Sequence, residues 1–303
     1  MKYLVVPILA LLMLSTVCPW QDKKSSSALD AMVQSERNFA KTSVEKGVRD
    51  SFIEFFAEDG INFQPGPTKT KEAFLSRPAP AQKPTSVLNW EPIYADMASS
   101  GDLGYTTGPY TNVDSGPDKR PTRYGYYFSI WKKQADGTFK VAVDCGIQTP
   151  APNGPLTLKL QTGAPAKGKL ATPNTPQETG RAELLTFDKE FLRNAESQSL
   201  LYAYGRYLSG DARMHRNGFF PFTDRAGIQT YLKMKPIAMK WWPMKSDVSI
   251  AGDLGYTYGN YEISDPSTKR VTEKGYYVRV WKRDLNGTWG LVLDTTNPLP
   301  AGQ

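Results

Sequence analysis

Histidine and cysteine are almost absent from this sequence of 303 residues, which holds one histidine, His215, and two cysteines, Cys18 and Cys145. A single histidine excludes a metal site built from several histidines, so we predict neither a metal nor another cofactor. If Cys18 is removed with the N-terminal segment, Cys145 has no partner for an intramolecular disulfide. The position of Cys145 at the end of an apolar strand favours a buried, unreactive thiol.

The motifs that identify common enzyme classes are missing too. The sequence has no nucleophile elbow, no phosphate-binding loop, no dinucleotide-binding glycine pattern and no Cys/His spacing typical of metal sites. Its net charge of +7 is not gathered into a basic stripe. Because nucleic-acid-binding proteins usually concentrate positive charge on one face, we do not expect a nucleic acid as a partner.

Long apolar runs are confined to the N-terminus. Met1-Lys2 supplies a positive charge, and the apolar run Leu4–Leu14 that follows is too short to span a bilayer. This pattern predicts a signal peptide, so we interpret residues 1–27 as the signal peptide and polar tether of an exported protein, either periplasmic or secreted. The alternative is lipidation at Cys18, which would anchor the protein to a membrane, although the residues before this cysteine form a poor lipobox.

The most informative feature of the sequence is an internal repeat. Residues 101–106 and 252–257 both read GDLGYT. Further matching blocks follow at an offset of 150 residues: Gly125-Tyr126-Tyr127 with Gly275-Tyr276-Tyr277, Trp131-Lys132 with Trp281-Lys282, and Asp144 with Asp294. A period of about 150 residues is the length of a domain and too long for a solenoid repeat, so we predict two copies of one domain.

Both copies have the same predicted order of elements. In the first copy, the apolar spacing predicts helices over 28–46, 48–58 and 69–75 and strands near 61–63, 87–94, 104–112, 124–134 and 139–144. In the second copy, it predicts helices over 186–195, 200–208 and 225–233 and strands near 212–215, 238–242, 256–263, 276–283 and 289–294. Helices followed by an antiparallel sheet predict an α+β fold.

A proline-rich stretch separates the copies. Residues 146–180 hold six prolines together with glycine, threonine and lysine, a composition typical of a linker. We therefore predict one domain over 28–148 and another over 181–303, joined by a linker over 149–180. Within this linker, Leu156–Leu160 alternates between apolar and polar residues and is a candidate edge strand.

These motifs and this order of elements resemble the SnoaL-like, ketosteroid-isomerase-like superfamily, also called nuclear-transport-factor-2-like. The resemblance covers residues 28–148 and 181–298 and is carried by GDLGYT, the GYY…W strand and the closing GTW…LD strand; the nearest likeness is to an uncharacterised bacterial branch. It implies two tandem cone-shaped domains, each with about three helices packed on a curved antiparallel sheet around a pocket. The superfamily includes isomerases, cyclases, hydrolases and proteins that only bind or oligomerise, so the resemblance does not choose among these functions.

The isomerases of that superfamily use a carboxylate base, with a tyrosine and a protonated aspartate as hydrogen-bond donors to an oxyanion. Asp144 and Asp294 are the catalytic candidates here, because each ends the last apolar strand of its copy. Burial near the mouth of a cone would raise the pKa of such a carboxyl. The simpler interpretation is a strand-end aspartate that accepts backbone N–H bonds in the next turn. Asp102 and Asp253, within GDLGYT, are predicted to be turn residues.

One strand in each copy offers a face that mixes aromatic and polar side chains, as small-ligand sites usually do. Alternation along these strands gives six candidate ligand-binding residues: Tyr127, Ser129, Trp131, Tyr277, Arg279 and Trp281. The alternative is a half-exposed face or a subunit contact. The opposite faces carry purely apolar residues, which we predict as core: Phe128, Ile130, Val278 and Val280.

The second copy alone carries Arg213 and His215, which alternation places on one face of a short strand. Together with Arg279, these ligand-binding candidates could form an anion-binding pocket. His215 is also a catalytic candidate, although a lone histidine is more often structural. The matching place in the first copy has Asn62 and Gln64 without a cation. The two pockets should therefore differ, and the first is the candidate for a degenerate one.

Three hypotheses about function follow. We favour an exported protein that binds a small molecule and performs no chemistry, because no convincing acid–base pair accompanies the aromatic faces. The second hypothesis is an isomerase, cyclase or hydrolase that uses Asp294 with Arg213 or His215, or else Asp144, and it requires a carboxyl with a raised pKa. The third is an interaction module with pairing sheet faces. Domains of this kind often dimerise, so we predict a pseudo-dimer of the two copies or a homodimer.

Overall fold

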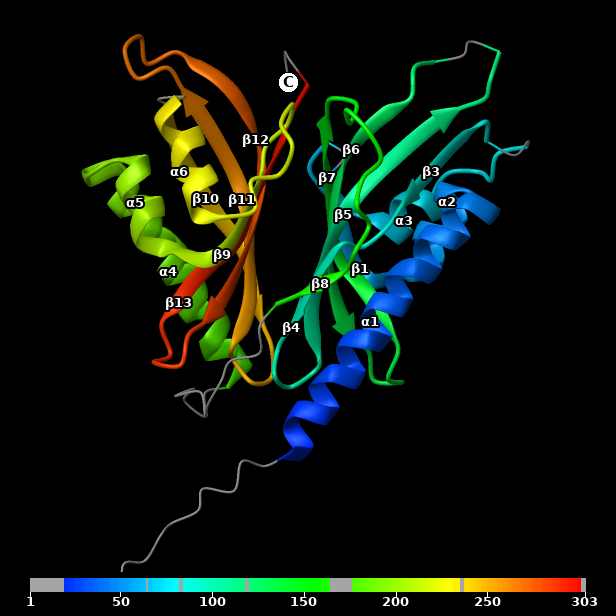
Figure 1. The fold of residues 1–303 in the computed structure, drawn as a ribbon, viewed down its shortest axis with the longest axis horizontal. Coiled ribbons are helices and arrows are strands. Elements are labelled where there is room, and N and C mark those ends of the chain that lie inside the picture. The colour runs from blue at the N-terminus through cyan, green and yellow to red at the C-terminus, as the bar shows by residue number, and fades with distance from the viewer. Residues whose placement is uncertain are drawn as a thin grey trace, which may run out of the picture.

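The computed structural model describes residues 19–63, 65–81, 84–117, 120–163, 176–234 and 237–300. Its helices form two outer layers, and two β-sheets face each other between them (Figure 1). Within the described residues, each half of the chain places three helices against one curved sheet, so the fold is α+β, as the sequence predicts. The predicted signal peptide falls mainly on residues 1–18, which lie outside the described residues.

The first half of the chain runs from α1 to β7 and the second from α4 to β13. The helices are α1 (Pro19–Lys46), α2 (Val48–Phe55), α3 (Thr70–Leu75), α4 (Gln177–Ser197), α5 (Leu200–Tyr207) and α6 (Arg225–Met234). The strands of the first half are β1 (Phe56–Phe63), β2 (Pro67–Lys69), β3 (Ser86–Trp90), β4 (Tyr94–Met97), β5 (Leu103–Asp114), β6 (Arg123–Lys133) and β7 (Phe139–Thr149). After β8 (Gln161–Thr162), the strands of the second half are β9 (Leu208–His215), β10 (Ala238–Val248), β11 (Leu254–Ser264), β12 (Val271–Arg283) and β13 (Trp289–Pro298).

The two sheets have related topologies. The first has the order β2-β1-β7-β6-β5-β4-β8, with β3 also paired to β5, and the second has the order β10-β11-β12-β13-β9. Most neighbours are antiparallel, but β1 runs parallel to β7, β9 to β13 and β4 to β8. These pairs depart from the antiparallel arrangement that the sequence predicts for each sheet. Parallel neighbours need a long crossover, and the elements between β1 and β7 and between β9 and β13 supply it.

Several predicted boundaries differ from the structure. The helix predicted over 48–58 ends at Phe55, and β7 continues to Thr149, beyond the predicted end of the first domain. Helix α1 begins at Pro19, so the predicted polar tether belongs to a helix, and α4 begins at Gln177, inside the predicted linker. Apolar periodicity detects the turns that pack on the sheet, and the first turn of α4 is mostly exposed. The candidate strand at Leu156–Leu160 does not form; instead, the two residues of β8 pair with β4. In the described parts of the chain, no helix has both the length and the apolar character of a membrane span.

The two sheets pack against each other through apolar faces. Phe128 and Ile130 of β6 and Val278 and Val280 of β12 belong to one buried cluster that contains residues of both halves. We predicted these four residues as the core of each separate copy, but the structure places them between the copies. Both faces of β6 and β12 are buried, so alternation alone cannot tell which face meets the helices and which meets the other sheet.

Two ion pairs connect the halves in a symmetric manner. Lys132 Nζ lies 2.5 Å from Oδ2 of Asp247, and Lys282 Nζ lies 2.7 Å from Oδ2 of Asp96. Lys132 and Lys282 are equivalent positions of the repeat, and the two aspartates are equivalent as well. An exchange of the same contact in both directions is what a two-fold axis between two identical subunits would produce.

The repeated GDLGYT motif forms a turn that adds to this contact. The glycine before each aspartate has a positive φ, 70° in the first copy and 68° in the second, a conformation that glycine adopts without strain. Asp102 and Asp253 lie in these turns, as predicted, and each also reaches the other half. Asp102 Oδ2 accepts the N–H of Ile250 at 3.0 Å, and Asp253 Oδ2 accepts the N–H of Ser99 at 2.9 Å.

Candidate functional site

The first half contains a cavity of about 280 Å³ between helices α1 and α2 and the inner face of its sheet. Most of its wall is apolar or aromatic: Phe39, Phe52, Phe63, Leu88, Trp90, Tyr110 and Tyr127. Its polar residues are few: Asn62, Asn112, Arg123, Asp144 and Asn297. Asn297 belongs to β13 of the second half, and its Nδ2 donates to the carbonyl oxygen of Phe63 at 3.1 Å. An apolar wall with a few placed polar groups is typical of a small-ligand site, so this cavity is the candidate site.

Three predicted residues lie close together on one wall of this cavity region. Tyr127 and Ser129 point to the same face of β6, and Asp144 lies opposite Ser129 on β7. Ser129 Oγ donates to Asp144 Oδ2 at 2.8 Å. The Tyr127 hydroxyl is buried and, in the described part of the chain, has no partner in good hydrogen-bond geometry, although the Thr106 hydroxyl is near enough to lower its pKa. A buried hydroxyl without a well-placed partner is costly.

The carboxyl group of Asp144 is protonated at neutral pH. Burial raises its pKa to about 8, the nearby Glu36 carboxyl adds to the rise, and the hydrogen bond from Ser129 opposes it. Asp144 is half-buried and lines the cavity. Because Ser129 occupies Oδ2, the acid proton can be donated from Oδ1 to a ligand. Burial also raises the pKa of Tyr127 well above its usual value, so this hydroxyl keeps its proton.

A second carboxyl lies behind this wall, and the sequence analysis missed it. Glu36 of α1 is fully buried and accepts three hydrogen bonds, from Trp90 Nε1 at 2.5 Å, Thr106 Oγ1 at 2.5 Å and Trp131 Nε1 at 2.8 Å. Burial raises its pKa, and the three donors oppose the rise. The predicted ligand-binding residue Trp131 is therefore a fully buried donor to Glu36 and not part of the cavity wall.

The equivalent region of the second half is filled by an ion network. Arg279, at the position of Ser129, donates from Nη1 to Asp188 Oδ1 at 2.7 Å and from Nε to Asp294 Oδ1 at 2.8 Å. All three side chains have no exposed surface. Asp188 takes the place that Glu36 has in the first half, since it accepts the indole N–H of Trp241 at 3.0 Å.

Asp294 has a second cation and a hydroxyl as partners. Arg216 Nη2 donates to Oδ2 of Asp294, and Tyr204 Oη donates to the same atom at 2.7 Å. Although burial alone would raise the pKa of Asp294, the two arginines hold it at about 2. A pKa of about 2 keeps Asp294 ionised at neutral pH, in contrast to Asp144, so Asp294 lacks the raised pKa that the enzyme hypothesis requires.

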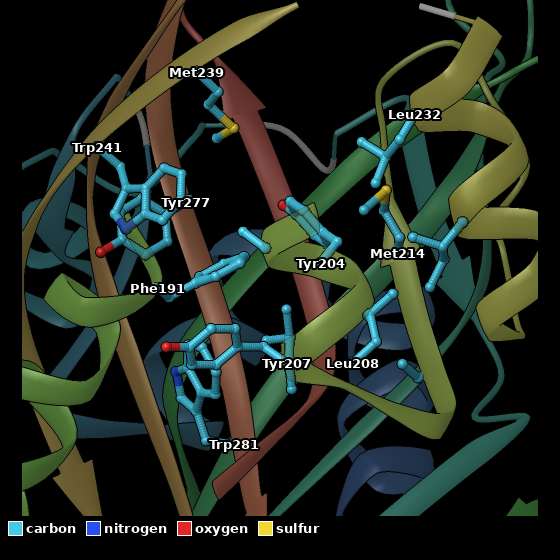
Figure 2. Packing of buried hydrophobic residues seen from close by; sticks show 14 of the residues in the cluster. Phe191, Tyr204, Tyr207, Leu208, Met214, Leu232, Met239, Trp241, Tyr277 and Trp281 are labelled. Atoms are coloured by element: carbon cyan, nitrogen blue, oxygen red, sulfur yellow. The ribbon is translucent and has the colours of Figure 1, made fainter. Parts of the chain in front are cut away.

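Aromatic side chains complete the filling of the second half. The ring of Phe191 lies 4.8 Å from that of Trp241 and 5.0 Å from that of Tyr207, measured between centroids, and Figure 2 shows these rings clustered in the interior. The Arg279 guanidinium lies 4.1 Å from the centroid of Trp241 and 4.3 Å from that of Tyr277. We expected the first copy to be the degenerate one, but the open cavity belongs to the first copy and the cation fills the second.

The predicted grouping of Arg213, His215 and Arg279 is wrong. Arg279 points toward the helices, whereas Arg213 and His215 point toward the other sheet. The Arg213 guanidinium lies 3.9 Å from the ring centroid of Tyr94, and the His215 ring lies 6.3 Å from that of Tyr126. Burial, with the neighbouring arginines, lowers the pKa of His215 to about 3, so it is neutral. Arg279 lies on the face of β12 that contacts the helices, whereas Arg213 and His215 lie on the face of β9 that contacts the other sheet. Alternation within one strand does not show which of its faces contacts the helices.

The two remaining predicted residues, Tyr277 and Trp281, are internal hydrogen-bond donors. Tyr277 Oη donates to Asp188 Oδ2 at 2.7 Å, and Trp281 Nε1 donates to Thr257 Oγ1 at 2.9 Å. Both side chains are fully buried. Among the described residues, no group of three or more His, Cys, Asp or Glu side chains is placed as metal ligands would be.

The sequence matches no known family profile and no curated protein. Its structure is similar to that of a putative scytalone dehydratase from Novosphingobium aromaticivorans, with 12% identity and a TM-score of 0.34 over 46% of this chain and 95% of that one. It is also similar to ActVI-ORFA from Streptomyces coelicolor, with 16% identity and a TM-score of 0.31 over 39% of this chain and 95% of that one.

A third similar structure is a nuclear-transport-factor-2-like protein from Shewanella oneidensis, with 15% identity and a TM-score of 0.32 over 39% of this chain and 96% of that one. Each of these matches covers less than half of this chain and most of the solved chain. At such low identity the likeness concerns the fold alone. The similar structures include nuclear-transport-factor-2-like proteins, the group that the sequence motifs resemble.

Proposed function

We propose that this protein binds a small, largely apolar molecule with one oxygen acceptor in the cavity of its first half. In this proposal, the Tyr127 hydroxyl and the protonated Asp144 carboxyl both donate to that oxygen. The N-terminal sequence supports the further proposal that binding takes place after export. The second half then serves as a closed partner domain that contributes Asn297 to the wall of the cavity.

One observation carries the proposal: Tyr127, which has a buried hydroxyl, and Asp144, which has a carboxyl of raised pKa, both line the same largely apolar cavity. Two neutral donors suit a carbonyl, phenol or enolate oxygen, because neither carries a negative charge that would repel it. In an apolar surrounding such hydrogen bonds are stronger than in water. The aromatic walls favour a ring system as the remainder of the ligand.

The first prediction concerns Tyr127→Phe. With 2-naphthol as a fluorescent probe, we expect saturable binding to the unaltered protein and binding about five- to ten-fold weaker to the variant, because one buried hydrogen bond is lost. The same change should leave the thermal stability of the free protein equal or slightly higher, because it removes a buried hydroxyl without a well-placed partner. Fluorescence titration and thermal unfolding measure the two effects.

Tyr277→Phe is the matched control, since Tyr277 is the equivalent residue of the second half. Its hydroxyl donates to buried Asp188, so this variant should lose stability and keep its affinity for 2-naphthol. The proposal would be overturned by an absence of saturable binding, or by equal effects of the two variants on affinity.

The pKa of Asp144 favours one second candidate function, proton transfer to or from a ligand in the same cavity. A carboxyl that titrates at about pH 8 can exchange its proton near neutral pH, as general acid–base catalysts do. Asp144→Asn separates the two candidates. Asparagine can keep its carbonyl oxygen toward Ser129 and donate an N–H to the ligand, so binding should be retained, whereas any proton transfer would be lost.

A further inference from the structure

We infer that the ligand carries an anionic group, such as a carboxylate, at the end opposite its oxygen acceptor, and that Arg123 and Asn112 bind this group. The inference rests on the proposed function and names the class of ligand more closely: an aromatic or alicyclic carboxylate with a carbonyl or hydroxyl oxygen at its far end. Arg123 and Asn112 both line the cavity that contains Tyr127 and Asp144.

The position of Arg123 along β6 sets the length of this ligand. Arg123 and Tyr127 are four positions apart in one strand and therefore lie on the same face, about 13 Å apart along the strand. Arg123 is exposed and Tyr127 is buried, so the cavity leads from solvent at the guanidinium to the buried hydroxyl. The long arginine side chain shortens the gap, so a molecule of two fused rings can span it.

Arg123 and Asn112, the two donors at the open end of the cavity, have no anionic partner among the residues that the structure describes. Among the described residues, no carboxylate pairs with Arg123, whereas the neighbouring Arg120 lies 2.8 Å from Asp114. Asn112 is the strand partner of Arg123, and its side-chain oxygen accepts the Ser86 hydroxyl at 2.5 Å. The amide N–H₂ of Asn112 is therefore left to donate beside the guanidinium.

The charges of the cavity also favour an anion at this end. Asp144 is the one acidic residue among those that line the cavity; it lies near the other end and is protonated at neutral pH. In the second half, the position of Arg123 is occupied by Glu273, whose carboxylate accepts the Tyr261 hydroxyl at 2.6 Å. The cation is thus specific to the half that has the open cavity.

The test compares two probes of nearly the same shape, 6-hydroxy-2-naphthoate and its methyl ester, which differ by one negative charge. We expect the acid to bind about five-fold more tightly at low salt, because a partly exposed ion pair contributes up to about 1 kcal/mol. The preference should shrink as salt screens the pair. Arg123→Gln should abolish the preference because it removes the cation, whereas Arg120→Gln should keep the preference.

The outcomes separate this inference from the proposed function. If the ester binds and Tyr127→Phe weakens it, but the acid has no advantage, the anion site is overturned and the proposed function stands. If the advantage of the acid persists in Arg123→Gln, the anion lies elsewhere and the inference is also overturned. If neither naphthoate probe nor 2-naphthol binds, the proposed function itself fails.

Discussion

Replacing Arg279 with methionine is expected to destabilise the protein by about 3–5 kcal/mol, because it leaves a buried carboxylate without its cation. Asp188 has no exposed surface, and Arg279 is the one cation paired with it among the described residues. Asp294 would keep Arg216 and the Tyr204 hydroxyl, so the loss concerns Asp188 first. Methionine fills much of the volume of the arginine side chain, so little of the lost stability would come from an empty cavity. Chemical denaturation measures the change in the free energy of unfolding.

Two companion variants make this result specific. Adding Asp188→Asn to Arg279→Met removes the unpaired charge and should recover a large part of the lost stability. Ser129→Ala, the change at the equivalent position of the first half, should cost only about 1 kcal/mol, since it removes one hydrogen bond to a neutral acid. A loss for Arg279→Met no larger than that of Ser129→Ala would show that the network does not hold the second half together.

The second large effect is a change in how stability depends on pH, and it is expected for Asp144→Asn. The folded-state pKa of Asp144 is about 8, well above the value of about 3.9 for an unfolded chain. Between these values the folded protein holds a proton that the unfolded chain has released. Stability therefore falls as pH rises through this window.

Asparagine cannot ionise, so the variant should gain stability relative to the unaltered protein as pH rises from 5 to 9. We expect a relative gain on the order of 2 kcal/mol, less than full linkage gives, because the exposed edge of Asp144 faces the cavity. Unfolding curves of both proteins at each pH measure the difference, and Asp144→Asn compared at pH 4 serves as the reference. Parallel stability curves across the window would mean that Asp144 titrates normally.

The internal repeat made the fold predictable from the sequence. GDLGYT and its companion blocks indicated two copies of one α+β domain. The second half of the structure has the predicted order of helices and strands, whereas the first half adds β2 and divides one predicted strand into β3 and β4. The packing of the halves was harder to assign. We predicted Phe128 and Val278 as the cores of separate domains, but they belong to one shared cluster. In a strand that is buried on both faces, the sequence does not indicate which face contacts a helix and which contacts another sheet.

Part of the candidate site was also predictable. Tyr127, Ser129 and Asp144 were proposed from strand alternation and from the resemblance, and the structure brings them together. Glu36 and Asp188 were missed, although each occupies a helix position that the apolar period assigns to the core. A carboxylate on the buried face of a helix is rarely placed without partners, and this signal could have found both residues.

Arg279 is one of the side chains that make the two halves differ. The sequence showed Arg279 where the first half has Ser129, and a cation in that place suggested an anion site. What alternation could not show is that Asp188 and Asp294 converge on Arg279 from a helix and a strand. Only tertiary packing determines whether such an arginine is left open to a ligand or is neutralised within the protein.

A crystal structure of the complex with 6-hydroxy-2-naphthoate is the most direct test of this account. We predict one bound molecule per chain, in the first half, with its hydroxyl oxygen between Tyr127 and Asp144 and its carboxylate at Arg123. Density inside the second half between Asp188 and Asp294, or binding at the surface with the first cavity empty, would contradict it.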